Sequence, residues 1–142
     1  MTTPHLIRLR APWECRVVPR DERGADDPPA VHCTRHFNAP TNLDADERVW
    51  LVCDAVDFQA RFALNGHRLG TIEGHCPQPR LDLTEKLRPH NVLAIEIELA
   101  PDGAPPEHVE YGPRGLPGGI GEVWLEIARH VTDWKIETLD PR

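Results

Sequence analysis

The residues of this sequence that are best suited to binding a small polar molecule lie in two segments rich in glycine and proline. The first segment holds Glu110, Tyr111 and Arg114. The second holds His75, and Arg80 follows it closely. An aromatic ring packs against the C–H face of a sugar ring, while guanidinium, imidazole and carboxylate groups bond to its hydroxyls. These side chains are a candidate carbohydrate-binding site. The alternative is that Tyr111 packs its own loop and the charged groups are solvated.

Hydrolysis of a glycosidic bond would need two carboxylates held about 5 to 10 Å apart. Glu73, Glu107 and Glu110 lie between the expected strands. Nothing in their spacing fixes a separation of that kind. We therefore expect no catalytic residue, no enzyme activity and no cofactor.

Histidine and cysteine are adjacent at His32-Cys33 and at His75-Cys76, and His36 lies near the first pair. A zinc site needs several converging ligands. Neighbouring residues in a strand point to opposite faces, so one such pair cannot readily chelate an ion. The acidic loops also lack the ligand spacing of an EF-hand. We expect no metal site.

The chain has 142 residues, with 16 basic and 23 acidic side chains and a formal net charge of −7. This balance argues against a nucleic-acid partner or an anionic membrane. The N-terminus shows no apolar signal segment, and no stretch approaches the roughly 20 apolar residues of a membrane span. We expect a cytoplasmic protein without membrane contact. The cysteines, at positions 15, 33, 53 and 76, are then expected to be thiols.

The elements that must position these groups show period-two alternation, which is typical of strands. Residues 57–64 place Phe58, Ala60, Phe62 and Leu64 on one face. The dipeptide at 65–66, Asn-Gly, favours a type I′ hairpin, and the return strand is expected at 67–72. The same alternation runs through 91–99 and 122–127.

Further strands are expected at 5–10, 13–18, 31–37, 48–54, 79–83 and 131–138. One helical turn is expected at 83–88, with Thr84 as its N-cap. Many short strands among 15 prolines and 10 glycines favour a sandwich or barrel.

The alternation also predicts where two tryptophans point. If Val49, Leu51 and Cys53 face the core, Trp50 faces outward, and by the same rule Trp124 faces outward between Val123 and Leu125. Large exposed apolar patches usually mark interfaces. Trp50 and Trp124 are therefore a candidate association surface.

Several motifs, taken in order, resemble the N-terminal sugar-binding domain of family 2 glycoside hydrolases. They are RHF at 35–37, RVWLVCDAVD at 48–57, ALNG at 63–66 with Gly70, LDLTEKL at 81–87, NVLAIEI at 91–97 and GGIGEVWLEI at 118–127. The resemblance covers roughly residues 31–138. After Ile120 the sequence departs from the aromatic and arginine that are common in the family.

The resemblance implies an all-β fold, a galactose-binding-like jelly-roll β-sandwich, as one domain over residues 1–142. It also implies that the loops carrying the candidate ligands share one end of the sandwich, and that the catalytic barrel of those enzymes is missing. We expect a non-catalytic carbohydrate-binding module. The alternative is a structural or protein-interaction module. The expected partners are a carbohydrate, and either a second copy of this chain or a separate catalytic chain.

Overall fold

The computed structural model describes residues 5–10, 12–22, 24, 26–56, 59–74, 76–77, 80–99, 116 and 120–129. Nearly every element in these ranges is a short strand. The strands are β1 His5–Arg8, β2 Glu14–Val17, β3 Ala30–Asn38, β4 Glu47–Cys53, β5 Ala55–Val56, β6 Gln59–Leu64, β7 His67–Glu73, β8 Cys76–Pro77, β9 Arg80–Asp82, β10 His90–Glu98 and β11 Val123–Arg129. Two single 3₁₀ turns, η1 Arg20–Glu22 and η2 Thr84–Lys86, join them.

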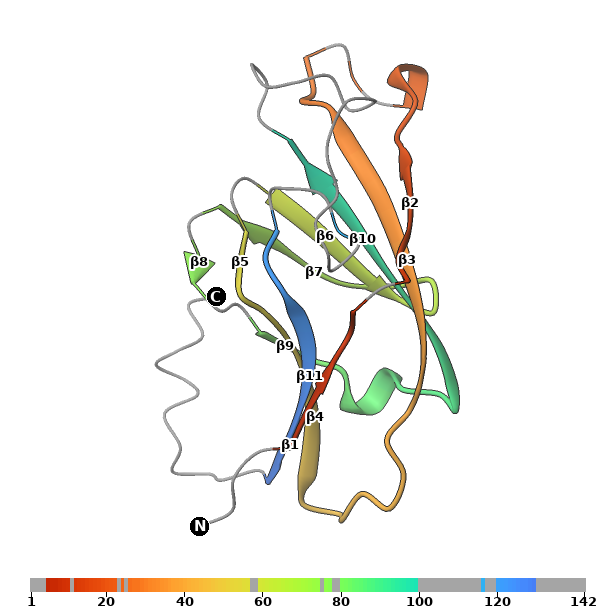
Figure 1. Cartoon of the computed structure of the whole chain (residues 1–142), viewed down its shortest axis with the longest axis vertical. Helices are drawn as coiled ribbons and strands as arrows, with labels where there is room; N and C mark the ends of the chain where they lie inside the picture. The colour runs from red at the N-terminus through yellow and green to blue at the C-terminus, as the bar shows by residue number, and fades with distance from the viewer. Residues whose placement is uncertain are drawn as a thin grey trace.

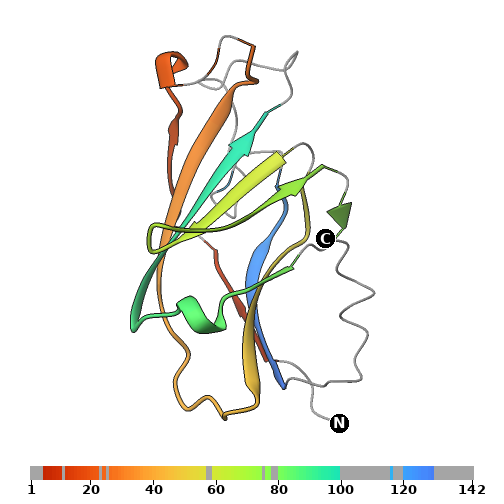
Figure 2. The ribbon, with the colours of Figure 1, turned by 180° about the vertical axis from the view of Figure 1, so that it is seen from behind.

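The strands form two antiparallel sheets that pack face to face as a sandwich (Figures 1 and 2). The four-stranded sheet has the order β1-β11-β4-β9, and the five-stranded sheet has the order β2-β3-β10-β6-β7. A short third ladder pairs β5 with β8. The predicted all-β, galactose-binding-like sandwich is confirmed. The predicted strand at 131–138 lies outside the described residues, and one domain over residues 1–142 stays a prediction.

The core lies between the inner faces of the two sheets, where the period-two alternation places the apolar side chains. On β6 the residues Ala60, Phe62 and Leu64 are buried, as are Val123 and Leu125 on β11. The run of leucine and isoleucine along β10 is buried in the same way. This alternation is as predicted. Phe58, which the same pattern places on the core face, lies outside the described residues.

The hairpin between β6 and β7 also follows the prediction. Asn65 and Gly66 have φ of 54° and 83°, and a type I′ turn requires a positive φ at both central positions. Asn65 does more than allow the turn, because its side-chain oxygen accepts a hydrogen bond from the amide of Val92 at 2.9 Å. Its Nδ2 also donates to Oδ1 of the buried Asn91 at 2.9 Å. The turn is thereby tied to β10.

Two expectations from the sequence are wrong. Thr84 does not cap η2: the N-cap position is Leu83, and it makes no side-chain capping bond. The Thr84 hydroxyl instead accepts a hydrogen bond from the amide of Val49 on β4 and donates one to the carboxylate of Asp82.

The expectation of free thiols is wrong for Cys15 and Cys33, which form a disulfide between β2 and β3. The two residues are direct cross-strand partners in the register of these strands, so their side chains share one face and meet. Cys53 is buried in the core and takes no part in this disulfide. The cytoplasmic location stays a prediction.

Candidate functional site

One end of the sandwich is organised around Val56, which is buried in the core. Val56 pairs with Cys76 in the β5–β8 ladder and forms an isolated bridge with Ile120. Leu116 and Ile120 are also buried in the core, at 1% and 4% exposure. The chain that follows His75 and the chain that follows Arg114 therefore return to the same place in the fold.

The candidate carbohydrate ligands themselves are only partly described. His75, Glu110, Tyr111 and Arg114 lie outside the described residues, so their role as a binding site stays a prediction. Arg80 is described, and it opens β9 opposite Val52 on the outer face of the four-stranded sheet. Its guanidinium forms an ion pair with Glu126 on β11 at 3.2 Å, and the two side chains are 25% and 15% exposed.

The outer face of the four-stranded sheet carries both predicted outward tryptophans. The strand register places Arg8, Trp124, Val52 and Arg80 side by side in one row across it, and Leu6, Glu126, Trp50 and Asp82 in the next. We call these eight residues the tryptophan face. Trp50 and Trp124 are partly buried and lie outside the core cluster. Their position on the outer face agrees with the alternation, while their role as an interface stays a prediction.

Arg8 packs against one side of the Trp124 ring on this face. The guanidinium carbon of Arg8 lies 6.0 Å from the centre of its ring, which is a cation–π arrangement. The indole Nε1 of Trp124 is buried and finds no acceptor among the described residues. On the same face, Leu6 is 44% exposed, and it is the one large hydrophobic side chain in the described part of the chain that is exposed.

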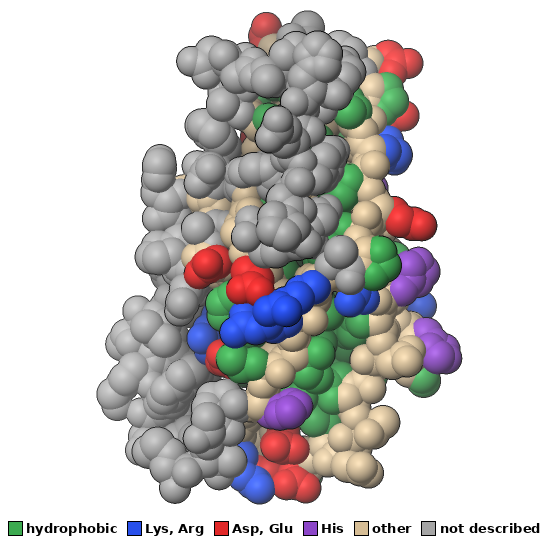
Figure 3. Space-filling model, in the orientation of Figure 1, with side chains coloured by type: hydrophobic (Ala, Val, Ile, Leu, Met, Phe, Trp, Pro, Cys, Tyr) green, Lys and Arg blue, Asp and Glu red, His purple; other side chains and the backbone are tan. Residues whose placement is uncertain are grey.

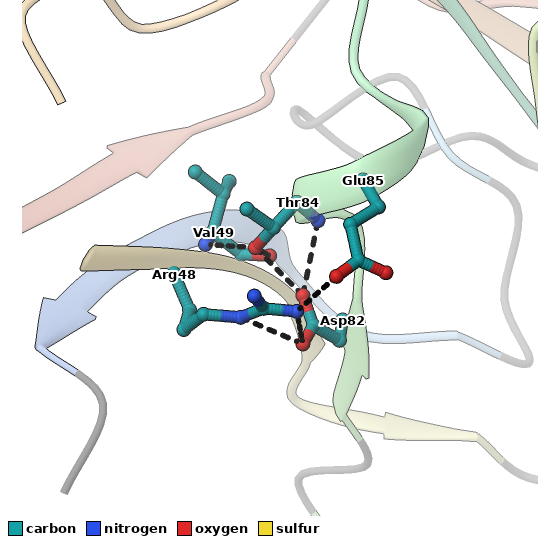
Figure 4. Close-up of polar contacts among 5 residues, drawn as sticks. All are labelled: Arg48, Val49, Asp82, Thr84 and Glu85. Carbon is teal, nitrogen blue, oxygen red and sulfur yellow. Dashed lines mark hydrogen bonds and ion pairs between the residues drawn. The ribbon is translucent and has the colours of Figure 1, made fainter. Parts of the chain in front are cut away.

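A polar cluster ties β4 to the chain that runs from β9 into η2 (Figure 4). Asp82 accepts hydrogen bonds from the amide and the hydroxyl of Thr84, at 3.0 and 2.7 Å. Arg48 donates two bonds to the other oxygen of the same carboxylate, at 2.7 and 3.1 Å. The Thr84 hydroxyl also accepts a bond from the amide of Val49 at 2.8 Å. Glu85 adds a looser contact, 3.6 Å from Arg48.

This cluster shifts the pKa of Asp82. Burial alone raises the pKa of its carboxyl, but the hydrogen bonds from Thr84 and Arg48 and the charge of Arg48 outweigh burial and lower it. The same contacts, the hydrogen bond to Asp82 first, raise the pKa of Arg48. Every charged group in the cluster has a partner within the protein, so the cluster is a structural link between strands and not a reactive site.

The outer face of the five-stranded sheet is polar. Arg61 on β6 forms an ion pair with Glu96 on β10 at 3.0 Å and lies 3.5 Å from Glu98. His32 lies opposite Glu96 on this face, while Cys33 points into the core. The prediction that His32 and Cys33 point to opposite faces of the sheet is therefore confirmed. Within the described ranges, no group of three or more His, Cys, Asp or Glu side chains is arranged to hold a metal ion.

A group of basic side chains lies near the middle of the face shown in Figure 3, with a smaller group of acidic side chains beside it. At the carboxylate of Glu122, Arg8 lies at 2.9 Å and Arg10 at 3.6 Å. Both arginines are substantially exposed, so these pairs contribute little to stability. None of the helical segments in the described part of the chain is long and apolar enough to span a bilayer.

Solved structures with a similar fold are glycosidases much longer than this chain. The FMN-binding β-glucuronidase from Facaelibacterium prausnitzii L2-6 matches with a TM-score of 0.65 and 22% identity, over 89% of this chain and 23% of that chain. A putative β-galactosidase from Bacteroides fragilis matches with a TM-score of 0.63 and 18% identity, over 90% and 24%. The β-glucuronidase from Bifidobacterium dentium, solved with coumarin-3-O-glucuronide, matches with a TM-score of 0.62 and 20% identity, over 89% and 30%. At these identities the matches show the fold.

No curated protein matches the chain. A family model, described as the glycosyl hydrolase 2 galactose-binding domain-like domain, matches residues 30–134, which is most of the chain. The match begins at β3 and includes β3 to β11, whereas β1 and β2 precede it. The chain therefore belongs to the galactose-binding domain-like family of glycosyl hydrolase 2.

Proposed function

We propose that this domain is a non-catalytic carbohydrate-binding module. The observation that carries the proposal is its membership of a family described as galactose-binding domain-like. Three solved glycosidases contain a domain of the same fold, and the chain spans 23%, 24% and 30% of their lengths. We accordingly propose carbohydrate binding for this domain, and we do not extend the catalytic activity of those proteins to it.

The proposed site lies at the end of the sandwich organised around Val56. The bridge from Val56 to Ile120 and the pairing of Val56 with Cys76 support a common location for the two segments that hold His75 and Tyr111. In this site Tyr111 stacks on the sugar ring, and Glu110 and Arg114 bind its hydroxyls. Arg80 contributes from β9, where a ligand would compete with Glu126 for its guanidinium.

Isothermal titration calorimetry with a panel of glucuronides, galactosides and oligosaccharides tests this site. The expected result is a heat of binding for one sugar class that disappears in Tyr111→Ala. The control is His67→Ala, an exposed side chain at the hairpin between β6 and β7, and binding should survive that change. The absence of heat with every sugar, from protein shown by circular dichroism to be folded, would contradict the proposal.

A second candidate function is association with another protein through the tryptophan face. It is favoured by the exposed Leu6, which lies on the same face as the two outward tryptophans. A second copy of the chain or a separate catalytic chain would cover this face. Sedimentation equilibrium tests the first of these partners: Trp50→Lys should convert a dimer into a monomer, and Arg61→Ala on the opposite sheet should not. A wild-type monomer at high concentration would contradict a homodimer.

A further inference from the structure

The N-terminal part of the chain spans both sheets. β1 pairs with β11 at the edge of the four-stranded sheet, and β2 pairs with β3 at the edge of the five-stranded sheet. We call the described residues 5–10 and 12–17 the N-terminal clasp. The family model begins at residue 30, so the clasp precedes the part of the chain that matches the family.

Noncovalent contacts hold the middle of the clasp. Leu9 and Trp13 are buried, at 2% and 8% exposure. The Trp13 indole donates to the carbonyl of Leu9 at 3.0 Å, and the amide of Leu9 donates to the carbonyl of Val123 at 2.9 Å. Arg35 on β3 donates to the carbonyl of Arg10 at 2.6 Å. These contacts close one side of the sandwich.

The far end of the clasp is held differently. β2 has four residues, and among the described strands it pairs with β3 alone. A strand this short at an edge is held by few backbone hydrogen bonds. Apart from the backbone itself, the disulfide from Cys15 to Cys33 is the covalent cross-link in the described residues between the clasp and the family-matched segment, and it closes a loop with a sequence separation of 18. Closing that loop removes much of the entropy gained when the strand detaches.

We propose that the Cys15–Cys33 disulfide is a redox-controlled lock on the N-terminal clasp. Cys33 is fully buried, whereas Cys15 on the edge strand is partly exposed, so an external dithiol reaches the sulfur of Cys15 first. One thiolate of the dithiol attacks the Cys15 sulfur and forms a mixed disulfide with it. The bond between Cys15 and Cys33 breaks, and Cys33 leaves as a thiolate that takes up a proton. The second thiolate of the dithiol then attacks the mixed disulfide and releases Cys15. The protein gains two electrons and two protons, and the dithiol becomes a disulfide.

Reduction leaves the clasp held only by noncovalent contacts, namely the short ladders of β1 and β2, the hydrogen bonds described above and the burial of Leu9 and Trp13. Opening of the clasp uncovers the edge of β3 and the core beneath Trp13, while the strand pairs of β10 with β3 and β6 remain. The structural change is therefore local. Whether the clasp is closed or open then depends on the ratio of thiol to disulfide in the surrounding solution.

Hydrogen–deuterium exchange followed by mass spectrometry tests the proposal on the whole chain, oxidised and after treatment with dithiothreitol. Reduction should lower amide protection in β1 and β2 by roughly 10- to 100-fold and leave β6 and β10 unchanged. The double variant Cys15→Ser/Cys33→Ser should behave like the reduced protein, and dithiothreitol should not change it further. If that variant does not fold, the reduction of the wild type still decides the outcome.

Three results would overturn the lock. Unchanged protection of β1 and β2 would show that noncovalent contacts suffice to hold the clasp. Loss of protection in β6 and β10 as well would make the disulfide a staple for the whole fold. Alkylation of both Cys15 and Cys33 in air-purified protein would show that the bond does not form.

Discussion

Replacing Asp82 with alanine removes the central acceptor of the cluster that joins β4 to β9 and η2 (Figure 4). Two of the lost bonds come from Thr84, at 3.0 and 2.7 Å, and each contributes about 1 kcal/mol. The ion pair with Arg48 joins side chains that are 28% and 31% exposed. Solvent screening reduces its contribution to about 0.5–1 kcal/mol. We expect Asp82→Ala to lower the free energy of unfolding by about 2–3 kcal/mol.

Urea denaturation followed by tryptophan fluorescence measures this change, provided that the denaturant slope is constant across variants. Asp82→Asn keeps an oxygen for Thr84 and loses the ion pair, so it should cost about 1 kcal/mol. The control is Glu85→Gln, because Glu85 is 81% exposed and 3.6 Å from Arg48. That change should stay within about 0.5 kcal/mol of the wild type. A cost for Asp82→Ala no larger than the control would refute the reasoning.

The same variant gives a pH test. The pKa of Asp82 is lower in the folded protein than its usual value. Its contribution is therefore fully present above the unfolded carboxyl pKa of about 3.9 and is lost as the pH falls through the lower folded value. The stability difference between wild type and Asp82→Ala should be constant near neutral pH and shrink below about pH 4. A difference that grows as the pH falls would contradict the lowered pKa.

Three further changes test other parts of the fold. Asn91→Ala removes a side chain that is 1% exposed and bonds to Arg88 and Asn65. Urea denaturation should show that it lowers the free energy of unfolding by about 2–4 kcal/mol, whereas the control Asn38→Ala, at an exposed position, should lower it by less than about 0.5 kcal/mol. Gly66→Ala meets no atom within 4 Å but must adopt a φ of +83°, so a melting curve should show a loss of about 1–2 kcal/mol that Gly70→Ala does not reproduce. Trp13→Phe leaves the carbonyl of Leu9 without its indole donor, which should cost about 1–3 kcal/mol and raise amide exchange in the clasp more than in β10.

The sequence determined the sheet-forming segments and the face of each that is buried. Alternation along β6, β10 and β11 depends on neighbours two residues apart, so it can be recognised without knowing the partner strand. The Asn65-Gly66 turn was predictable for the same reason, since its positive φ values are a local requirement. The outward position of Trp50 followed from that alternation as well. The motifs in order were enough to indicate the family.

The candidate site could be predicted only as a set of residue types. Tyr111, Glu110, Arg114 and His75 suit a sugar by their chemistry, but their mutual distances depend on how loops far apart in sequence come together. Arg80 illustrates the limit. Its sequence position follows the segment of His75, whereas in the fold it lies on a sheet face with Glu126, which is distant in the sequence.

Tertiary structure alone decided the contacts between strands. Cys15 meets Cys33, Arg48 meets Asp82, and Asn91 joins the β6–β7 hairpin to the chain before β10 because the register and order of the strands place them opposite or beside one another. No local pattern carries that information, since the register of each pair is set by the packing of the whole core. For the same reason Thr84, with the composition of a helix cap, serves as a bridge to β4.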